Sequence, residues 1–502
     1  MNKFRLGSIV KTTSGATPLS YIKEYYENAD IPWINSGEVG QYKINKAQKF
    51  ISEKGFSNSN TKFIPKGSVL IAMYGATAGR TSLLNIDNAT TNQAICSILP
   101  NENICNSFLK YKLDTLYNYL VGISSGSARD NLSQKTIQDL ILDLPNLYTQ
   151  QKIASVLSAL DDKIEINSRI NAELELMAKT LYDYWFVQFD FPNSPPLEGW
   201  QNSKNFDGVV GYKSSGGKMV YNETLKKEIP EGWEVTVFND WIKNTKAGDW
   251  GKEAIEGNYI ERVYCIRGAD INGINGKGEV KAPERFILKN NSSKKLMPND
   301  FIVEISGGSP VQSTGRIALI TESTLERFDT DIICSNFCKA VSIKDEKYIY
   351  NFKQEWQRLY DAGVLFGFEG KTSGIKNFLF DSFMNSYSIV LPQKEIVEKY
   401  YEFAKSIDKK IQSNLKQNQE LSALRDWLLP MLMNGQVKVG DAEKLVLEIV
   451  SKSDASYNRS SQKNDDEIFE VWLKEEGLAA RGDIDKATLR ELFDAMDDED
   501  KY

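Results

Sequence analysis

A segment of this chain occurs twice, and no other feature of the sequence constrains the fold as strongly. The text SALDDKIEINSRINAEL begins at Ser158, and SIDKKIQSNLKQNQEL begins at Ser406. Between Asp161 and Leu174, seven of fourteen positions are identical when residue 161 is set against residue 408, and both asparagines are kept. Two helices that share only an apolar pattern would not be this similar, so the sequence predicts an internal duplication.

The repeated segments lie within two long candidate helices. Their apolar residues recur at alternating steps of four and three, the a and d spacing of a coiled coil. The first seam consists of Ile153, Leu157, Leu160, Ile164, Asn167, Asn171, Leu174, Ala178, Leu181 and Trp185. The equivalent positions of the second are Tyr400, Ala404, Ile407, Ile411, Asn414, Asn418, Leu421, Arg425, Leu428 and Leu432. Arg425 fits this seam poorly, and the neighbouring Leu424 could take its place.

Each helix has an apolar stripe too narrow for a long helix to be stable alone in water, so each needs a partner. We expect the two copies to pair antiparallel about a pseudo-twofold axis. Asparagine in a coiled-coil seam costs stability but fixes the register of the helices. The residues expected to fix it are Asn167, Asn171, Asn414 and Asn418. The alternative is that each helix packs only on its own domain.

The text before each helix is also repeated, in the same order. The corresponding segments are IPWINSGEV from Ile31 and RVYCIRGADI from Arg262, GSVLIAMYGATAGR from Gly67 and NDFIVEISGGSPVQSTGR from Asn299, TTNQAICSILP from Thr90 and CSNFCKAVSI from Cys334, and SSGSARDNLS from Ser124 and FEGKTSGIKNF from Phe368. Short β-branched runs between Gly, Asn and Ser clusters indicate strands and loops of a mixed α/β domain.

The predicted fold is therefore α+β, with two similar mixed α/β domains separated by two long antiparallel coiled-coil helices. A segment rich in Pro, Gly and Ser follows the first helix and is expected to be a linker. The expected order is a domain at 1–147, a helix at 148–190, the linker at 191–228, a domain at 229–392, a helix at 393–435 and an acidic tail at 436–502. Within the tail we expect a short helix over AEKLVLEIV, followed by a polar hinge.

Composition excludes several kinds of chemistry. The chain has no histidine, so a Ser-His-Asp triad, histidine-ligated zinc and a histidine general base are excluded. The five cysteines, Cys96, Cys105, Cys265, Cys334 and Cys338, are an odd count and are expected to be reduced and buried. No stretch is long and apolar enough for a membrane span, and no signal-peptide pattern opens the chain. We therefore expect a cytoplasmic protein.

The negative charge is concentrated near one end of the chain. The net charge is -7, but Asp465 to Tyr502 alone carry fourteen acidic and five basic residues. That segment has a net charge of -9, which leaves the first 464 residues at +2. The acidic balance therefore does not argue against a nucleic-acid partner.

Motifs that suggest catalysis are incomplete. GATAGRTS from Gly75 has three residues between its glycines and then Arg80, whereas a phosphate-binding P-loop requires four and a lysine. NSPPL from Asn193 is an interrupted form of the NPPY-type motif of amino-methyltransferases. No complete catalytic set is visible. Two alternatives to a binding protein remain: a self-contained methyltransferase-nuclease, or a coiled-coil scaffold that binds only protein.

Glycine-rich loops with cations and short polar side chains recur in both halves. Such loops can bind phosphates through Lys, Ser, Thr and backbone N–H groups, and Arg and Asn can read base edges. The residues expected to contact double-stranded DNA are Asn35, Ser36, Gly37, Tyr74, Gly75, Arg80, Asn92, Ser125, Gly126, Arg129, Asn131, Arg267, Gly268, Asn272, Gly307, Arg316, Asn336, Gly370, Lys371, Thr372, Ser373 and Lys376. For each one alone, a solvated loop is the alternative, and only the recurrence favours DNA.

The chain resembles the specificity (S) subunits of type I restriction-modification enzymes over about residues 1–435. The most specific text is LYDYWFVQFDFP from Leu181 and GYKSSGGKMVYNETLKKEIPEGWEV from Gly211, which resembles the segment between the first helix and the second recognition domain. The segments LP...QKIASVLSALDDKI and LPQKEIVEKYYEFAKSIDKKI are similar to the conserved helical regions of the family. The tail after about residue 440 is not part of this resemblance.

The resemblance implies a non-catalytic DNA-binding subunit without a cofactor or metal of its own. Each recognition domain would read one half of a bipartite, asymmetric DNA sequence. The helices would set the spacer and dock two modification (M) subunits, which use S-adenosylmethionine to methylate adenine. Restriction (R) subunits would use ATP and Mg to translocate and cut DNA.

Overall fold

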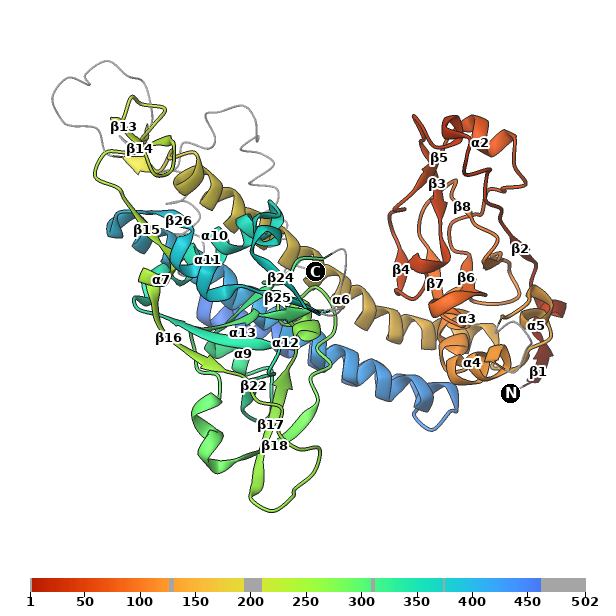
Figure 1. Cartoon of the computed structure of the whole chain (residues 1–502). Coiled ribbons are helices and arrows are strands. Elements are labelled where there is room, and N and C mark those ends of the chain that lie inside the picture. The colour runs from red at the N-terminus through yellow and green to blue at the C-terminus, as the bar shows by residue number, and fades with distance from the viewer. Residues whose placement is uncertain (1, 126–130, 194–209, 308–311, 373–374, 462–502) are drawn as a thin grey trace. The chain divides into compact units, whose positions relative to one another are not determined.

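The computed structural model describes residues 2–125, 131–193, 210–307, 312–372 and 375–461 (Figure 1). The chain forms two compact units. The first contains Met1–Glu165 together with Gln419–Lys452, and the second is built around Ile166–Asn418. The first unit is therefore assembled from two segments that are distant in the sequence. No helix among the described residues is long and apolar enough to cross a membrane.

A sheet with the same strand order lies at the centre of each unit. In the first unit the order is β2 (Thr12–Ser14), β9 (Ile95–Ile98), β6 (Val69–Ala72), β7 (Thr81–Leu84) and β4 (Lys43–Ile44). In the second it is β16 (Ile242–Ala247), β23 (Cys338–Ile343), β19 (Asp300–Glu304) and β21 (Ile317–Ile320). Strands β6 and β19 are buried along their whole length, which fits the apolar sequence VLIA and the apolar centre of DFIVE. The two carboxylates at the ends of β19, Asp300 and Glu304, are paired with Lys246 and Arg316.

Two further sheets are also duplicated. The small sheet β5 (Phe50–Ile51), β3 (Ile31–Ile34) and β8 (Thr90–Thr91) corresponds to β18 (Glu284–Leu288), β17 (Tyr259–Ile266) and β22 (Ile332–Cys334). The antiparallel pair β1 (Asn2–Arg5) and β10 (Ile141–Leu144) corresponds to β15 (Glu234–Val237) and β26 (Ser388–Leu391). The repeated topology confirms the two similar mixed α/β domains, and the first three pairs of sequence segments occupy equivalent strands.

Two glycines show how closely the duplication is preserved. A Cβ added at Gly15 would lie 1.7 Å from the carbonyl oxygen of Thr91, and one added at Gly248 would lie 2.0 Å from that of Ser335. Both glycines follow the first strand of the central sheet. There the backbone passes directly against the end of the last strand of the small sheet, which is β8 in the first unit and β22 in the second. No side chain fits at either position, so both copies require glycine.

The fourth pair of segments is described in only one copy. FEGKTSGIKNF contributes to β24 (Glu369–Thr372) and β25 (Ile375–Phe378), which form a three-stranded sheet with β20 (Ser306–Gly307). Its partner SSGSARDNLS includes residues 126–130, which lie outside the described residues. This correspondence therefore stays a prediction.

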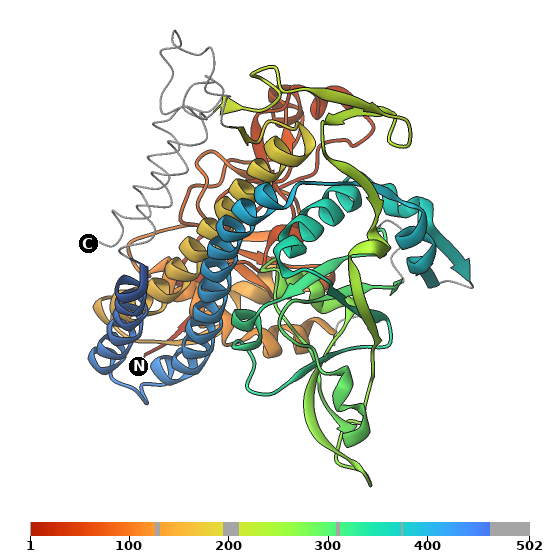
Figure 2. The same ribbon diagram turned by 90° about the vertical axis from the view of Figure 1, so that its left-hand side faces the viewer.

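The two long helices are α6 (Leu147–Tyr182) and α12 (Lys394–Met433), which run side by side in Figures 1 and 2. In the first unit, Leu157 and Leu160 share a buried core with Leu421, Leu428 and Leu432. In the second unit the seam continues as a small cluster of Leu174, Ala178, Ile407, Ile411 and Leu415. The predicted seam is thus buried between the helices, which confirms the antiparallel pair.

The segment expected to be a linker contains strands. Strands β11 (Pro192–Asn193) and β12 (Val210–Gly211) pair antiparallel, and β13 (Met219–Asn222) forms a hairpin with β14 (Lys227–Pro230). Phe191 stacks on Trp233 with ring centroids 5.0 Å apart, and this contact joins the segment to an aromatic core. Of its described residues, Ser214, Ser215 and Gly216 lie in a turn between β12 and β13.

The end of the described chain also differs from the expectation. The single helix α13 (Val439–Ser461) includes residues that were expected to form a polar hinge. Ala442 and Val446 on this helix are buried against the core of the first unit. The acidic segment from Asp465 onward lies outside the described residues.

Candidate nucleic-acid interface

In each unit a buried carboxylate shapes the loop that follows the central strand of the small sheet. In the first unit Glu38 accepts hydrogen bonds from the backbone N–H groups of Asn35 and Gln48, both at 2.9 Å. Glu38 is only 7% exposed. The carboxylate thus holds the turn Ser36–Glu38 in a fixed shape, and the exposed Gly37 lies within that turn.

Asp270 makes the same two connections in the second unit. It accepts hydrogen bonds from the backbone N–H groups of Arg267 and Lys281, both at 3.0 Å. Its side chain is almost completely buried. SGEV and GADI place an acidic residue at the same point of both copies. Sequence reasoning overlooked this signal, although it marks the loop that presents the predicted residues.

Several loops of the first unit meet beside this turn. Thr77 Oγ1 donates a 2.8 Å hydrogen bond to the carbonyl oxygen of Ser36, which joins the loop after β6 to the loop after β3. Asn92 N–H donates to the carbonyl oxygen of Ile34, at 3.0 Å. Leu132 N–H donates to the carbonyl oxygen of Met73, at 3.0 Å. This hydrogen bond brings the segment of the exposed Asn131 close to the segment of Tyr74.

The structure therefore brings most of the predicted residues of the first unit into one loop cluster, which we call the first-unit loop cluster. Its described members are Asn35, Ser36, Gly37, Tyr74, Gly75, Asn92 and Asn131. Gly75 has φ +77°, a conformation that favours glycine, and Tyr74 before it is 37% exposed. An exposed aromatic ring beside amide and hydroxyl groups is a surface suited to base edges and sugars.

The two equivalent arginines of the duplication have different environments. Gly79 and Gly315 both donate a backbone hydrogen bond to the last residue of the preceding central strand, Ala72 and Glu304 respectively. Arg80 and Arg316 follow these glycines. Because alanine offers no carboxylate, the exposed Arg80 lies instead over the ring of Tyr117, 4.3 Å from its centroid.

Arg316 forms an internal ion pair. Its guanidinium makes two hydrogen bonds with Glu304, at 2.8 and 2.6 Å, and the side chain is 16% exposed. These hydrogen bonds raise the pKa of Arg316 above its ordinary value. A bidentate, nearly buried pair of this kind leaves few donors for a phosphate. Of the two equivalent arginines, only Arg80 is available to a ligand.

Two other cations of the second unit are also engaged internally. Arg267 donates two side-chain hydrogen bonds to Asp270, at 2.8 and 3.0 Å, and one to the carbonyl oxygen of Lys281, at 2.7 Å. Lys376 lies 3.2 Å from Glu369, and its side chain is 17% exposed. Burial would raise the pKa of Glu369, but hydrogen bonds from Thr314 and Lys376 outweigh it and lower the pKa.

The remaining predicted residues of the second unit lie on turns and on the small sheet β20-β25-β24. Gly307 is paired with Lys376, and Gly370 with Asn377. Asn272 and Asn336 are exposed, while Gly268 faces Glu304, whose Oε1 lies 2.7 Å from the position of an added Cβ. The neighbouring Phe337 is 51% exposed and was not predicted.

Some predicted residues cannot be placed. Gly126, Arg129 and Ser373 lie outside the described residues. For Ser125, Lys371 and Thr372 the structure gives the backbone only: Ser125 ends α4 (Tyr117–Ser125), and Lys371 and Thr372 belong to β24. Their contact with DNA stays a prediction.

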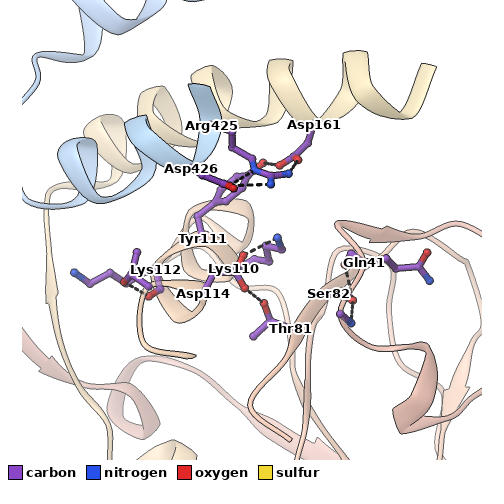
Figure 3. Close-up of polar contacts among 12 residues, drawn as sticks. Gln41, Thr81, Ser82, Lys110, Tyr111, Lys112, Asp114, Asp161, Arg425 and Asp426 are labelled. Atoms are coloured by element: carbon purple, nitrogen blue, oxygen red, sulfur yellow. Dashed lines mark hydrogen bonds and ion pairs between the residues drawn. The ribbon is translucent and has the colours of Figure 1, made fainter. Parts of the chain in front are cut away.

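The first unit is fastened to the helix pair by a buried polar network, drawn in Figure 3. Asp161 of α6 accepts a 2.5 Å hydrogen bond from the hydroxyl of Tyr111, on α3 (Asn106–Asp114). Its other oxygen accepts one from Arg425 of α12, at 2.6 Å. Arg425, expected to fit the seam poorly, therefore occupies its seam position by pairing with a carboxylate that is 3% exposed.

Each unit also contains a contact between its domain and the helices, at an equivalent place. In the first unit Asn45 bonds to Glu165, and Lys43 pairs with Asp162 at 2.5 Å. In the second unit Arg327 donates a 2.8 Å hydrogen bond to Gln412, and burial lowers the pKa of this arginine to about 10. The duplication relates residue 165 to residue 412, so the two domains are docked at matching points of the two helices.

The asparagines of the seam face one another in the second unit. Asn414 Nδ2 donates to Asn171 Oδ1 at 2.8 Å, and Asn167 Nδ2 donates to Asn418 Oδ1, also at 2.8 Å. Asn167 further donates to Gln417 at 2.7 Å. A step of four residues forward on α6 matches a step of four residues backward on α12, as an antiparallel pair requires. Their role in fixing the register stays a prediction.

Comparison with known proteins agrees with this architecture. The family model of the type I restriction modification DNA specificity domain matches residues 1–176. The type I restriction enzyme MjaIX specificity subunit of Methanocaldococcus jannaschii is 27% identical over 445 residues, which cover 87% of this chain and 93% of that protein. The HindI specificity subunit of Haemophilus influenzae is 23% identical over 450 residues, covering 81% and 94%.

One solved structure supports the fold. The crystal structure of the type I restriction-modification S subunit from M. genitalium has a TM-score of 0.51 and 14% sequence identity, and the match covers 86% of this chain and 95% of that one. The fold is thus that of a duplicated two-domain subunit held on a pair of antiparallel helices. The chain is thus similar over most of its length to specificity subunits of type I restriction enzymes, and its first 176 residues match the DNA specificity domain of that family.

Proposed function

We propose that this chain is the DNA-recognition subunit of a type I restriction-modification complex and is not itself an enzyme. The observation that supports this most directly is the duplication of one loop scaffold, because two similar scaffolds that present different side chains suit a bipartite, asymmetric DNA site. The shared scaffold is set by Glu38 and Asp270, and the residues it presents, Asn35 and Arg267, differ. Two domains of the same fold that present different side chains to the DNA recognise different base sequences.

The helix pair α6 and α12 would set the spacer between the two half-sites and dock the modification subunits. Those subunits would bring S-adenosylmethionine, and restriction subunits would bring ATP and Mg. The relatives are named as specificity subunits, which favours this role over a self-contained methyltransferase-nuclease or a protein-only scaffold. The complex would act in the cytoplasm, where its DNA lies.

Mapping of methylated adenines tests the proposal. We expect the chain with its modification subunits to methylate one bipartite sequence, while neither the chain alone nor the modification subunits alone give that pattern. The map would yield both half-sites and the spacer. Turnover by the isolated chain, or the same methylation pattern without it, would contradict the proposal.

An Arg80→Ala variant, compared with the parent chain in DNA-binding measurements at several salt concentrations, locates the interface. Arg80 is exposed and has no carboxylate partner among the described residues. Its loss is therefore expected to weaken DNA binding. The slope of log affinity against log salt concentration should become shallower by about one, the amount expected for one lost phosphate contact. The matched control is Lys3→Ala, which removes an exposed cation on β1. An equal loss in both variants would place the DNA on another surface.

A further inference from the structure

The turn between β22 and β23 of the second unit carries an exposed aromatic ring. The turn consists of Ser335, Asn336 and Phe337, and the Phe337 side chain is 51% exposed. Cys338 N–H closes the turn by donating to the carbonyl oxygen of Ser335, at 2.9 Å. A large apolar side chain therefore stands at the surface of a tight connection between two buried strands.

Hydrogen bonds on both sides fix this turn. Ser335 N–H donates to the carbonyl oxygen of Ile266 on β17, at 2.8 Å. The carbonyl oxygen of Phe337 accepts from the backbone N–H groups of Ile305 and Ser306, at 2.9 and 3.2 Å, where β19 ends. Binding residues are often held in this way, on loops that a rigid scaffold positions. The backbone under the Phe337 ring is thus in place before any ligand binds.

The first unit contains the same turn, formed by residues 92–94 between β8 and β9. The first residue of the turn donates to the carbonyl oxygen of Ile34 on β3, at 3.0 Å, and the last accepts from Met73 N–H after β6, at 2.8 Å. These two bonds match those of Ser335 and Phe337, so Ala94 is the equivalent of Phe337. Ala94 is only 8% exposed, so this turn presents no ring.

The exposed ring of the first unit belongs to the neighbouring loop. Tyr74, which is 37% exposed, lies two positions after the end of β6, and Ser306 lies two positions after the end of β19. The first unit therefore has Tyr74 beside Ala94, where the second has Ser306 beside Phe337. Both copies keep one exposed ring at this corner, but they supply it from different loops. The exchange indicates that the corner requires a ring.

The chemistry of the ring selects its contact on DNA. A phenylalanine side chain has no hydrogen-bond donor or acceptor, so it cannot bind the polar groups of a base edge. The apolar group that base pairs present in the major groove is the C5-methyl of thymine, and phenylalanine is among the side chains that contact it. Given the proposed function, on which this inference rests, we propose that Phe337 is a specificity-determining residue whose ring packs against a thymine methyl group in one half-site.

The test removes that methyl group alone. It uses the full chain in complex with its modification subunits and synthetic duplexes that carry the mapped bipartite site. Deoxyuridine replaces thymidine in one half-site at a time, which leaves every base pair intact. We expect the replacement in the half-site read by the second unit to weaken binding about fourfold, the effect of one methyl group that is no longer buried.

Three variants assign this effect to the ring. Phe337→Ala should bind the two duplexes of that half-site equally, whereas Phe337→Leu, which keeps an apolar contact, should retain part of the difference. Met297→Ala is the matched control, because Met297 is 57% exposed in the same unit but precedes the start of β19, the opposite end from Phe337. We expect Met297→Ala to distinguish thymidine from deoxyuridine as the parent chain does. Circular dichroism would verify that each variant is folded.

The outcomes separate this inference from the proposed function. A complex that methylates its bipartite site but binds all the duplexes equally, or a fourfold difference that persists in Phe337→Ala, would overturn the role of Phe337 alone. A site without any A·T pair would do the same. Insertion of the ring between base pairs predicts weaker binding by Phe337→Ala with no dependence on the methyl group, which would also overturn the proposed contact. Absence of sequence-dependent methylation would instead refute the proposed function, and the role of Phe337 with it.

Discussion

Arg425 shows how a single residue that breaks an apolar pattern can be stabilising. Its seam position would ordinarily hold leucine, but the carboxylate of Asp161 lies 2.6 Å from the guanidinium. Tyr111 completes the arrangement by donating to the same carboxylate. The three residues come from α12, α6 and α3, so the network joins both helices to the domain of the first unit. A buried pair of this kind specifies one arrangement because any other leaves a charge without a partner.

We predict that Arg425→Met lowers the free energy of unfolding by about 2 to 4 kcal/mol, because it leaves Asp161 buried with only Tyr111 as a partner. The figure is below that of a fully buried pair since the Arg425 side chain is 28% exposed. The double variant Asp161→Leu with Arg425→Met removes the unpaired charge and should recover at least half of the loss. Urea denaturation of the two variants and the parent chain measures the free energies of unfolding. A double variant as unstable as Arg425→Met would contradict the explanation.

At the scale of secondary structure, the paired asparagines are the clearest feature of the helices. Asn171 and Asn414 are both 6% exposed and bond to each other. An amide buried in an otherwise apolar seam is satisfied only opposite another polar group, so a shifted register would leave both amides without partners. The observed register is therefore favoured because every shifted register would bury unpaired amide groups, which costs free energy.

Removing the Asn171–Asn414 pair in two steps separates stability from register. Asn171→Leu alone should cost roughly 1 to 3 kcal/mol, because Asn414 stays buried without its partner. Asn171→Leu with Asn414→Leu should regain stability but admit other registers or oligomers, seen as added species in light scattering after gel filtration. A double variant that stays a single species with unchanged half-site spacing would contradict the register role.

The elements that the sequence predicted well are those with a repeated pattern. Heptad spacing located both long helices and their seam, and the correspondence of IPWINSGEV with RVYCIRGADI located equivalent strands. The hairpin β13-β14 was missed, because its strands are short and stand among turn residues. The ion pairs of Arg316 and Lys376 were missed because their partners lie 12 and 7 positions away, across strands whose register the pattern alone does not give.

At the scale of the whole molecule, the duplication makes a prediction about a fragment. Asn418 is the equivalent of Asn171, so two copies of α6 could pair with Asn167 of one copy opposite Asn171 of the other. We predict that residues 1–190 form a symmetric dimer through this seam, as measured by analytical ultracentrifugation. A fragment that remains monomeric at high concentration would show that the two helices are no longer interchangeable.

The dimer of residues 1–190 would lack one polar contact that the full chain has. Ala178 is the equivalent of Arg425, so the dimer lacks the arginine that Asp161 requires. Ala178→Arg is expected to strengthen the dimer several-fold by restoring that pair on both sides. Ala172→Arg places the same substitution on the exposed face of α6 and is the control. Equal effects of the two substitutions would mean that general charge, and not the seam, governs association.

The composition of the first unit also sets the order in which the chain can mature during synthesis. Its buried core includes Leu421, Leu428 and Leu432, which leave the ribosome more than 270 residues after the first residue of α6, Leu147 (421 − 147 = 274). Until then Leu157 and Leu160 lack their partners, and the N-terminal domain carries an exposed apolar stripe. A nascent chain interrupted before α12 is therefore a target for chaperones, proteases or pairing with a second nascent chain. Only a completed polypeptide contains the segment that closes the domain made first.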